Sequence, residues 1–225
     1  MKPELKHIVG IECLTVESSE ATTAVVFFHG YGANMHDLFP LWEMWHKEKF
    51  SWFFPNGVQA LPMGYYEGRA WFPIDMAALE LALRNNTPRD MGNTIPPGFK
   101  EVINQLELML LELNQKYKKV IIGGFSQGAM CASHLAMRPG IKVDGLILLS
   151  GNLVAESLLP PSARALPFYQ SHGSSDAVLP LSGAKLLERR LHQLNFQGKL
   201  HVFDGGHTIP NSVINEVKTF LHQFE

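Results

Sequence analysis

The stretch KKVIIGGFSQGAMCASHLAM (118–137) decides the fold class of this 225-residue chain. An apolar run leads into a glycine-rich turn, and the turn leads into a pattern typical of a helix. Ser126 lies in the turn between Gly124 and Gly128, a setting in which a strained strand-to-helix connection can expose a serine hydroxyl as a nucleophile. The same pattern would also fit a hydroxyl in a loop of small residues, so the residues upstream and downstream have to decide.

Composition and charge narrow the class of protein. The chain is 46% hydrophobic and 18% charged, with a net charge of -2, which is ordinary for a soluble globular protein and gives no electrostatic reason to expect nucleic acid or an anionic membrane as partner. No apolar run is long enough to span a bilayer, and the N-terminus lacks the apolar segment of a signal peptide, so we expect no integral membrane association and a cytoplasmic location. Cys13 and Cys131 indicate two small buried hydrophobes and no disulfide framework.

Short apolar runs alternate with longer amphipathic stretches along the whole chain. This rhythm predicts one α/β domain over 1–225, with a mostly parallel central sheet and helices on both of its faces. Strands are predicted at 24–28, 51–54, 119–124, 145–150, 167–172 and 199–204, with antiparallel edge strands from 7–16. Helices are predicted at 98–117, 127–137, 181–194 and 209–223.

Residues 55–96 interrupt this rhythm. They fill about forty positions between a strand and a helix, where such a loop normally takes roughly two to six. The segment is rich in proline, glycine, methionine and aromatic residues, and a short helix is predicted at 76–84. We interpret it as a lid or substrate-binding insertion; it could equally be a surface excursion packed on its own side chains, or a contact between two copies of the chain in a homodimer.

A serine hydroxyl is a poor nucleophile at neutral pH and needs a base. Of the histidines late in the chain, His192 falls in a helical pattern, His201 in a strand and His222 in the terminal helix. His207 lies in the loop FDGGHTIP (203–210), just past the carboxyl end of a predicted strand, where open α/β sheets place their chemistry. We therefore predict His207 as the base.

The acid that orients this histidine is predicted to be Asp176. It follows a predicted strand in the loop HGSSDAVLP (172–180), at the same end of the sheet, whereas Asp144 precedes its strand and belongs to the opposite end. Asp204 lies only three residues from His207 and is kept as the reserve candidate. The acid would hold the imidazole in the productive tautomer and stabilise the imidazolium.

An oxyanion hole needs two backbone donors aimed at the developing negative charge. We predict the N–H of Gln127, directly after the nucleophile, and the N–H of Tyr31 in the loop HGYGAN (29–34), whose glycines permit a tight turn. His29 in the same loop is interpreted as structural, its ring bonding the backbone of the turn around Ser126. The sequence holds no motif for a metal site.

The order and spacing of these motifs resemble the phospholipase/carboxylesterase family of small α/β-hydrolases, which includes acyl-protein thioesterases. The resemblance covers about residues 20–224. It implies an α/β-hydrolase fold, no cofactor, a triad of Ser126, Asp176 and His207, and oxyanion donors at Tyr31 and Gln127. The motifs that carry it are HGYGAN (29–34), WFPID (71–75), GFSQGAM (124–130), HGSSDAVLP (172–180) and GGHTIP (205–210).

The family resemblance also implies that the segment around Trp71 and Phe72 lines the acyl groove. Two departures bear on the substrate. Tyr31 and Asn34 stand where acyl-protein thioesterases usually carry leucine and aspartate, so the Tyr31 ring would narrow or polarise the acyl site, and WFPID replaces the more usual WFD. The eukaryotic depalmitoylating members are on this reading a poorer match than the broader esterases.

The sequence as a whole predicts a serine carboxylesterase. Its substrate would be a small-molecule ester with a short- to medium-length acyl chain, hydrolysed through an acyl-enzyme. Two alternatives stay open: a lysophospholipase or acyl-protein thioesterase, and a non-catalytic module that binds small molecules on a hydrolase fold.

Overall fold

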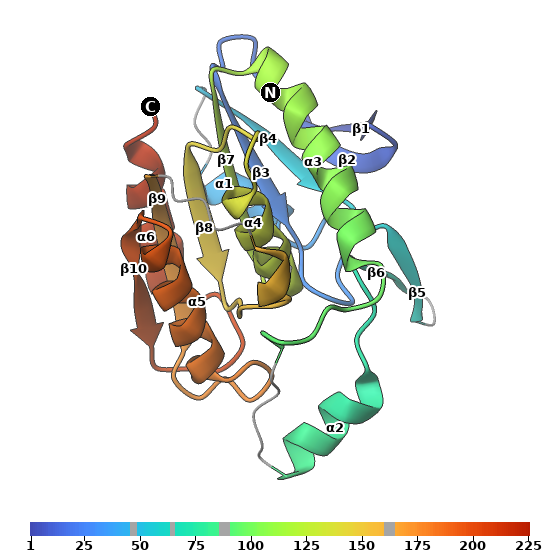
Figure 1. Cartoon of the computed structure of the whole chain (residues 1–225). Coiled ribbons are helices and arrows are strands. Elements are labelled where there is room, and N and C mark those ends of the chain that lie inside the picture. The colour runs from blue at the N-terminus through green and yellow to red at the C-terminus, as the bar shows by residue number, and fades with distance from the viewer. Residues whose placement is uncertain (46–48, 64–65, 86–90, 160–164) are drawn as a thin grey trace.

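The computed structural model describes residues 1–45, 49–63, 66–85, 91–159 and 165–225. The chain forms a single α/β domain around an eight-stranded sheet with the order β1-β2-β4-β3-β7-β8-β9-β10 (Figure 1). The strands from β4 to β10 run parallel, while β1 and β2 form an antiparallel hairpin at one edge, as predicted from 7–16. Their bounds are β1 Glu4–Ile8, β2 Ile11–Val16, β3 Thr23–Phe28, β4 Phe50–Pro55, β7 Lys119–Phe125, β8 Gly145–Leu149, β9 Leu166–Gly173 and β10 Phe196–Phe203.

Helices cover both faces of this sheet, as predicted. One apolar core lies between the sheet and α3, α4 and α5; a second lies between the opposite face and α1 and α6. All four helices predicted outside the insertion are confirmed, and α1 is an additional element that the sequence did not indicate. The bounds are α1 Phe39–Trp45, α3 Phe99–Lys116, α4 Gln127–Met137, α5 Leu181–Gln193 and α6 Asn211–His222.

The apolar spacing in α3 explains which way this helix faces. Phe99, Val102, Leu106, Met109 and Leu113 recur every three or four residues and are all buried. Burying one such side chain fully stabilises the fold by about 1.5–3 kcal/mol. This stripe therefore suffices to fix α3 against the sheet and to leave its polar face in solvent.

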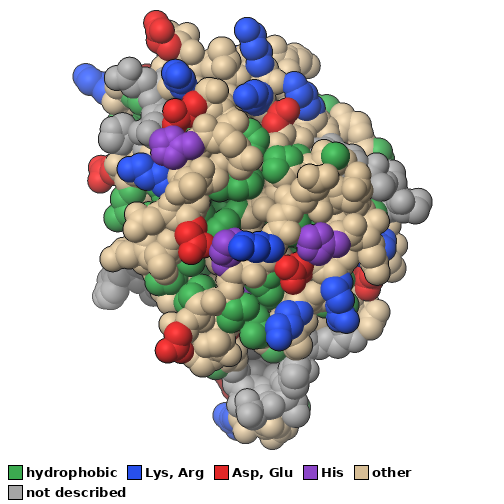
Figure 2. All heavy atoms as spheres, turned by 90° about the vertical axis from the view of Figure 1, so that its left-hand side faces the viewer, with side chains coloured by type: hydrophobic (Ala, Val, Ile, Leu, Met, Phe, Trp, Pro, Cys, Tyr) green, Lys and Arg blue, Asp and Glu red, His purple; other side chains and the backbone are tan. Residues whose placement is uncertain are grey.

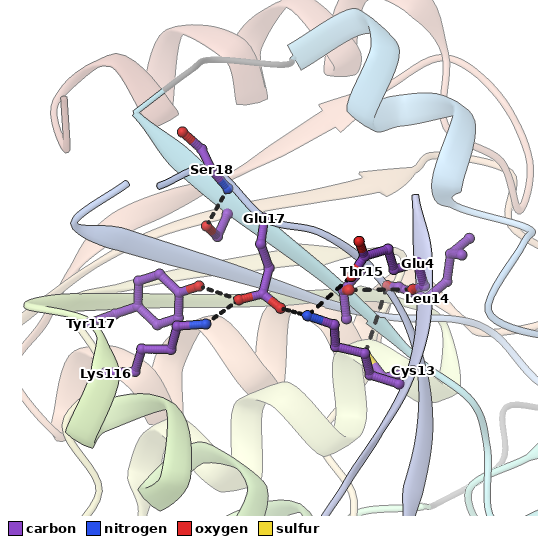
Figure 3. Close-up of polar contacts among 10 residues, drawn as sticks. Glu4, Cys13, Leu14, Thr15, Glu17, Ser18, Lys116 and Tyr117 are labelled. Atoms are coloured by element: carbon purple, nitrogen blue, oxygen red, sulfur yellow. Dashed lines mark hydrogen bonds and ion pairs between the residues drawn. The ribbon is translucent and has the colours of Figure 1, made fainter. Parts of the chain in front are cut away.

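A carboxylate links the edge hairpin to the end of α3 (Figure 3). Glu17, just after β2, accepts a hydrogen bond from Lys6 of β1 at 2.7 Å, one from the Tyr117 hydroxyl at 3.0 Å, and one from Lys116. Desolvation of the Glu17 carboxyl acts to raise its pKa, but these three donors outweigh it and lower the pKa from 4.5 to about 2. The charged form of Glu17 is thus part of the folded structure.

The insertion between β4 and α3 contains a small antiparallel hairpin and a helix. The hairpin consists of β5 (Gln59–Met63) and β6 (Tyr66–Ala70), and α2 (Met76–Asn85) confirms the short helix predicted at 76–84. Figure 1 shows α2 projecting away from the sheet, whereas β6 returns the chain to the main body. The insertion is therefore more ordered than its composition indicated, and the hairpin was not predicted.

The surface over β10, α5 and α6 carries charged groups of both signs. Figure 2 shows acidic, basic and histidine side chains interspersed with small apolar areas on this face. In the described ranges, no helix combines the length and the apolar character needed to cross a membrane.

Candidate active site

Ser126 occupies a strained turn between β7 and α4. Its backbone has φ 55° and ψ -117°, a region that residues with a side chain rarely adopt. The Ser126 N–H donates to Leu149 of β8 at 2.9 Å, and its carbonyl accepts from Met130 at 3.2 Å, so bonds on both sides hold the turn. The turn also needs its two glycines: a Cβ at Gly124 would collide with the backbone of Gly128, and a Cβ at Gly128 with the Phe28 carbonyl.

Ser126 opens into a cavity of about 190 Å³ at the carboxyl ends of the parallel strands. Its lining combines the polar groups singled out from the sequence with mostly apolar side chains, which is typical of a small-molecule site. The residues that line it are Gly30, Tyr31, Ile74, Met91, Phe125, Ser126, Gln127, Met130, Val178, Leu179 and His207.

The structure brings Asp176 and His207 together beside this cavity. His207 Nδ1 lies 2.6 Å from Asp176 Oδ2, and the His207 ring packs on Phe125 with 4.8 Å between ring centroids. The other oxygen, Oδ1, accepts the N–H groups of Val178 at 2.9 Å and Leu179 at 2.8 Å. Burial acts to raise the Asp176 pKa, but the bonds from His207 and Leu179 outweigh it and hold the pKa below 3.8. Asp176 is therefore an ionised, immobilised carboxylate whose second oxygen, Oδ2, contacts the His207 ring.

The reserve candidate Asp204 lies differently. It is exposed, and its carboxylate accepts a hydrogen bond from the Ser174 hydroxyl at 3.4 Å. The other histidines that were set aside occupy α5 (His192), β10 (His201) and α6 (His222), as their patterns indicated.

His172 is a neighbour of this pair that the sequence analysis missed. It is buried in β9, with Nε2 2.8 Å from the Leu179 carbonyl and 3.3 Å from Asp176 Oδ2. Because a carbonyl can only accept, Nε2 carries the proton. Burial lowers the His172 pKa below 6.5, so the ring stays neutral. The available signal was a histidine at the end of a buried strand, four residues before the predicted acid.

Two loops place the predicted oxyanion donors at the cavity. Gln127 is the first residue of α4, so its N–H has no acceptor within the helix. Tyr31 lines the cavity from the loop after β3, and the next two residues of this loop pair with β6. The Gly32 N–H donates to the Arg69 carbonyl at 2.9 Å, and the Arg69 N–H donates to the Ala33 carbonyl at 2.7 Å.

His29 is buried and its ring is bonded to backbone, although not to the turn around Ser126 as expected. Nδ1 lies 2.7 Å from the Gly30 carbonyl, and Nε2 accepts the Gly57 N–H at 2.8 Å. Burial is the main cause that lowers the His29 pKa to about 4, with the nearby Arg69 charge adding to it. The ring is thus neutral and joins its own loop to the chain that follows β4.

Trp71 and Phe72 correct an expectation about the acyl groove. Both side chains are fully buried in the core beneath the cavity, so they do not line it; Ile74 and Met91 represent the insertion in the lining. Sequence alone cannot separate an aromatic side chain of the core from one that lines a cavity, because both occupy apolar surroundings.

Within the described residues, no cluster of three or more histidine, cysteine, aspartate or glutamate side chains could hold a metal ion.

Known proteins with a similar sequence identify the family of this chain. The sequence profile of the Phospholipase/Carboxylesterase family matches residues 11–225, almost the whole chain. The chain belongs to the phospholipase/carboxylesterase family. Membership makes it a hydrolase of the carboxylesterase and acyl-protein thioesterase group.

Individual relatives agree with this membership. Acyl-protein thioesterase 1 of Gibberella zeae is 24% identical over 221 residues, 92% of each chain. Acyl-protein thioesterase 1 of Eremothecium gossypii is 33% identical over 141 residues, which spans 55% of this chain and only 57% of that relative. A carboxylesterase from Mesorhizobium loti shares the fold, with a TM-score of 0.76 and 16% identity over 98% of both chains.

Proposed function

We propose that this member of the phospholipase/carboxylesterase family is a serine carboxylesterase that hydrolyses esters of short- to medium-length acyl chains. The observation that carries the proposal is one cavity lined by Ser126 on its strained turn and by His207, which is itself bonded to the buried Asp176 at 2.6 Å. A nucleophile, a base and an orienting acid are the three groups of the serine triad that carries out acyl transfer.

The first half of the reaction would form an acyl-enzyme. His207 bonds Asp176 through Nδ1, which leaves Nε2 to take the Ser126 proton as Oγ attacks the ester carbonyl. The negative charge that develops on the carbonyl oxygen would be met by the N–H groups of Tyr31 and Gln127. When the tetrahedral intermediate collapses, the bond to the leaving oxygen breaks, and the imidazolium returns its proton to the departing alcohol.

The second half releases the acid. Water enters where the alcohol left, His207 removes one of its protons, and the resulting attack on the acyl carbonyl passes through the same oxyanion hole. Collapse frees the carboxylic acid and returns the proton to Ser126. No other group is needed to balance either half.

Cavity size supports the acyl-chain range. A volume of about 190 Å³, lined among others by Tyr31, Met91 and Met130, suits a short or medium acyl chain better than a palmitoyl group. The apolar lining would take the chain, while the polar groups converge at the carbonyl.

Active-site labelling tests the proposal. A fluorophosphonate probe should label the protein, and Ser126→Ala should abolish both labelling and ester hydrolysis. Ser133→Ala is the matched control, because this buried serine of the same helix bonds the Met130 carbonyl and lies outside the cavity lining. Labelling that survives in Ser126→Ala would overturn the nucleophile; a folded protein that neither reacts nor hydrolyses any ester would instead be a binding module.

The names of the relatives favour a second candidate, an acyl-protein thioesterase or, from the lysophospholipase-like protein 1 of Mus musculus, a lysophospholipase. The same groups would cleave a thioester, since only the leaving atom differs. Rates for matched oxygen esters and thioesters of two to sixteen carbons separate the candidates. A carboxylesterase should peak at short or medium chains, whereas a maximum at sixteen carbons on thioesters would favour the second candidate.

A further inference from the structure

We propose that residues 69–72, at the inner end of the insertion, are a positioning segment that sets the distance between the two oxyanion donors. The inference rests on the proposed function, because it assigns the segment a role in that same site. The two donors come from separate parts of the chain, Tyr31 after β3 and Gln127 at the start of α4. A pair of donors works only if both reach the same oxygen, so their relative placement must be held by something that contacts both.

The segment contacts the first donor loop through backbone. Arg69 of β6 accepts the N–H of Gly32 at 2.9 Å and donates its own N–H to Ala33 at 2.7 Å. These two bonds continue the hairpin onto the loop directly after Tyr31. The loop is thereby held as an added edge of β6 rather than as a free turn.

Two residues further on, the same segment contacts the second donor through a side chain. The Gln127 amide oxygen accepts the Trp71 N–H at 2.8 Å, and the amide nitrogen donates to the Phe72 carbonyl at 2.7 Å. Gln127 is 1% exposed, so neither bond competes with bulk water. The side chain of Gln127, whose backbone N–H is the second proposed donor, is therefore fixed at both of its polar atoms.

The Trp71 side chain adds a third connection, which returns to the first loop. Its indole N–H donates to the His29 carbonyl at 2.8 Å, and the two rings pack with 5.1 Å between centroids. The His29 ring in turn bonds the Gly30 carbonyl at 2.7 Å. Gly30 lines the cavity immediately before Tyr31.

Through Arg69, Trp71 and Phe72 the segment thus bonds to both sides of the proposed oxyanion hole, with hydrogen bonds of 2.7–2.9 Å. A shift of the donors of about 1 Å can cost roughly 100-fold in rate, so a fixed separation matters more to the transition state than to the bound substrate. This assigns the inner end of the insertion a part in catalysis without contact with the substrate, and it explains why Trp71 and Phe72 are buried rather than exposed in the cavity.

Two substitutions test the segment. Gln127→Met keeps the volume and the backbone N–H but removes both amide bonds, so it perturbs the donor's position and not its presence. Trp71→Phe keeps a buried aromatic ring and removes the indole bond to His29 together with part of the ring volume, a loss that the control below shares. Trp45→Phe is the matched control, because Trp45 is equally buried and its indole donates to the Ile214 carbonyl at 2.8 Å on the opposite face of the sheet.

The readout is the contrast between transition-state and ground-state binding. We expect Gln127→Met and Trp71→Phe to lower kcat about 10-fold with KM changed less than 2-fold. Both substitutions should weaken the binding of a trifluoromethyl ketone, whose adduct with serine carries an oxyanion. The affinity for the ketone should fall by the same factor as kcat/KM. Trp45→Phe should leave all three quantities within 2-fold of the unaltered protein.

Other outcomes distinguish a failure of the positioning role from a failure of the proposed function. If both variants match Trp45→Phe, or lose kcat without losing affinity for the ketone, the positioning role is wrong while the proposed function stands. If Ser126→Ala retains hydrolysis and ketone binding, the proposed function fails, and the inference fails with it.

Discussion

Asp176 and His207 are joined by a 2.6 Å hydrogen bond although 31 positions separate them in the chain. The bond exists because β9 and β10 are adjacent parallel strands, paired from Phe196 opposite Leu166 to Phe203 opposite Gly173. The loops after both strands consequently emerge side by side at the same edge. The N–H groups of Val178 and Leu179 then turn the carboxylate so that its second oxygen faces the ring.

This geometry predicts that the two candidate acids differ sharply in importance. Asp176→Asn should lower kcat/KM by about 10⁴-fold, because an amide can no longer hold the histidine tautomer or stabilise the imidazolium. Asp204→Asn should change it less than 3-fold, since its carboxylate contacts Ser174 at the surface. Steady-state rates on one short-chain ester measure both. A larger loss in Asp204→Asn would contradict the assignment of the acid.

His172 gives a prediction on the same loop. It holds the Leu179 carbonyl, and the Leu179 N–H in turn holds Asp176, so His172→Leu should loosen the carboxylate and lower kcat about 10-fold. The loss should appear in kcat with little change in KM, because the acid acts on the transition state rather than on the bound substrate.

A conservative variant distinguishes positioning from general damage. His172→Gln retains a side-chain N–H for the Leu179 carbonyl and should recover most of kcat. An equal loss of kcat in both variants would mean that His172 only fills space in β9.

The elements that could be predicted from the sequence are those with a strong local signal. The buried parallel strands are short continuous apolar runs, and α3 shows a clean spacing of three and four, so both were located to within a few residues. The helix α1 was missed because Phe39–Trp45 is short and almost uniformly apolar. The β5–β6 hairpin was missed because its residues carry no strict alternation.

The candidate site divides in the same way. That Ser126, Asp176 and His207 lie at one edge of the sheet was predictable, because each sits in a loop just past a predicted strand and the topology collects such loops there. The contacts of Gln127 and His172 were not, because both are tertiary: an amide bonded to Trp71 and Phe72, and a ring bonded to a loop seven residues on. No local pattern reports which backbone atoms a buried polar side chain will meet.

Buried histidines predict how stability depends on pH. Burial lowers the pKa of His134 from 6.5 to about 4, with the Arg138 charge adding to it and the bond to the Val154 carbonyl opposing it. The unfolded chain therefore takes up a proton near pH 6.5 that the folded protein resists until about pH 4, so stability is lost as the pH falls through this interval. One such group contributes at most about 1.4 kcal/mol per pH unit. Urea unfolding of His134→Gln should show that the free energy of unfolding falls less between pH 6.5 and 4 than it does in the unaltered protein.

Glu17 provides the contrasting case at lower pH. Its pKa is lowered from 4.5 to about 2, so the stability that it contributes is complete above pH 4.5 and is lost as the pH falls toward 2. Glu17→Gln should destabilise the protein by about 1 kcal/mol at pH 7, since the group is only partly buried. It should reduce the loss of stability between pH 4.5 and about 2 and leave the loss between pH 6.5 and 4 unchanged. If His134→Gln or Glu17→Gln instead reduced the loss of stability in the pH range assigned to the other residue, the pKa assignments would be wrong.

The cavity lining predicts a change in acyl-chain preference. Met130 lines the cavity and is 2% exposed, so Met130→Ala should extend the space for the chain. Each methylene accommodated in an apolar pocket is worth about 1–3 kcal/mol in kcat/KM. We therefore expect the optimum on a series of p-nitrophenyl esters to move about two carbons longer, with activity on acetate reduced.

Destabilisation could mimic such a change, and Met109 offers the control. It is fully buried in α3, and the described residues that line the cavity do not include it. Met109→Ala should cost a comparable 2–5 kcal/mol of folding stability, of the order expected for a buried methionine, without moving the optimum. An unchanged optimum in Met130→Ala, or the same movement in both variants, would show that the acyl chain does not occupy this cavity, and the preference for short and medium chains would then need another origin.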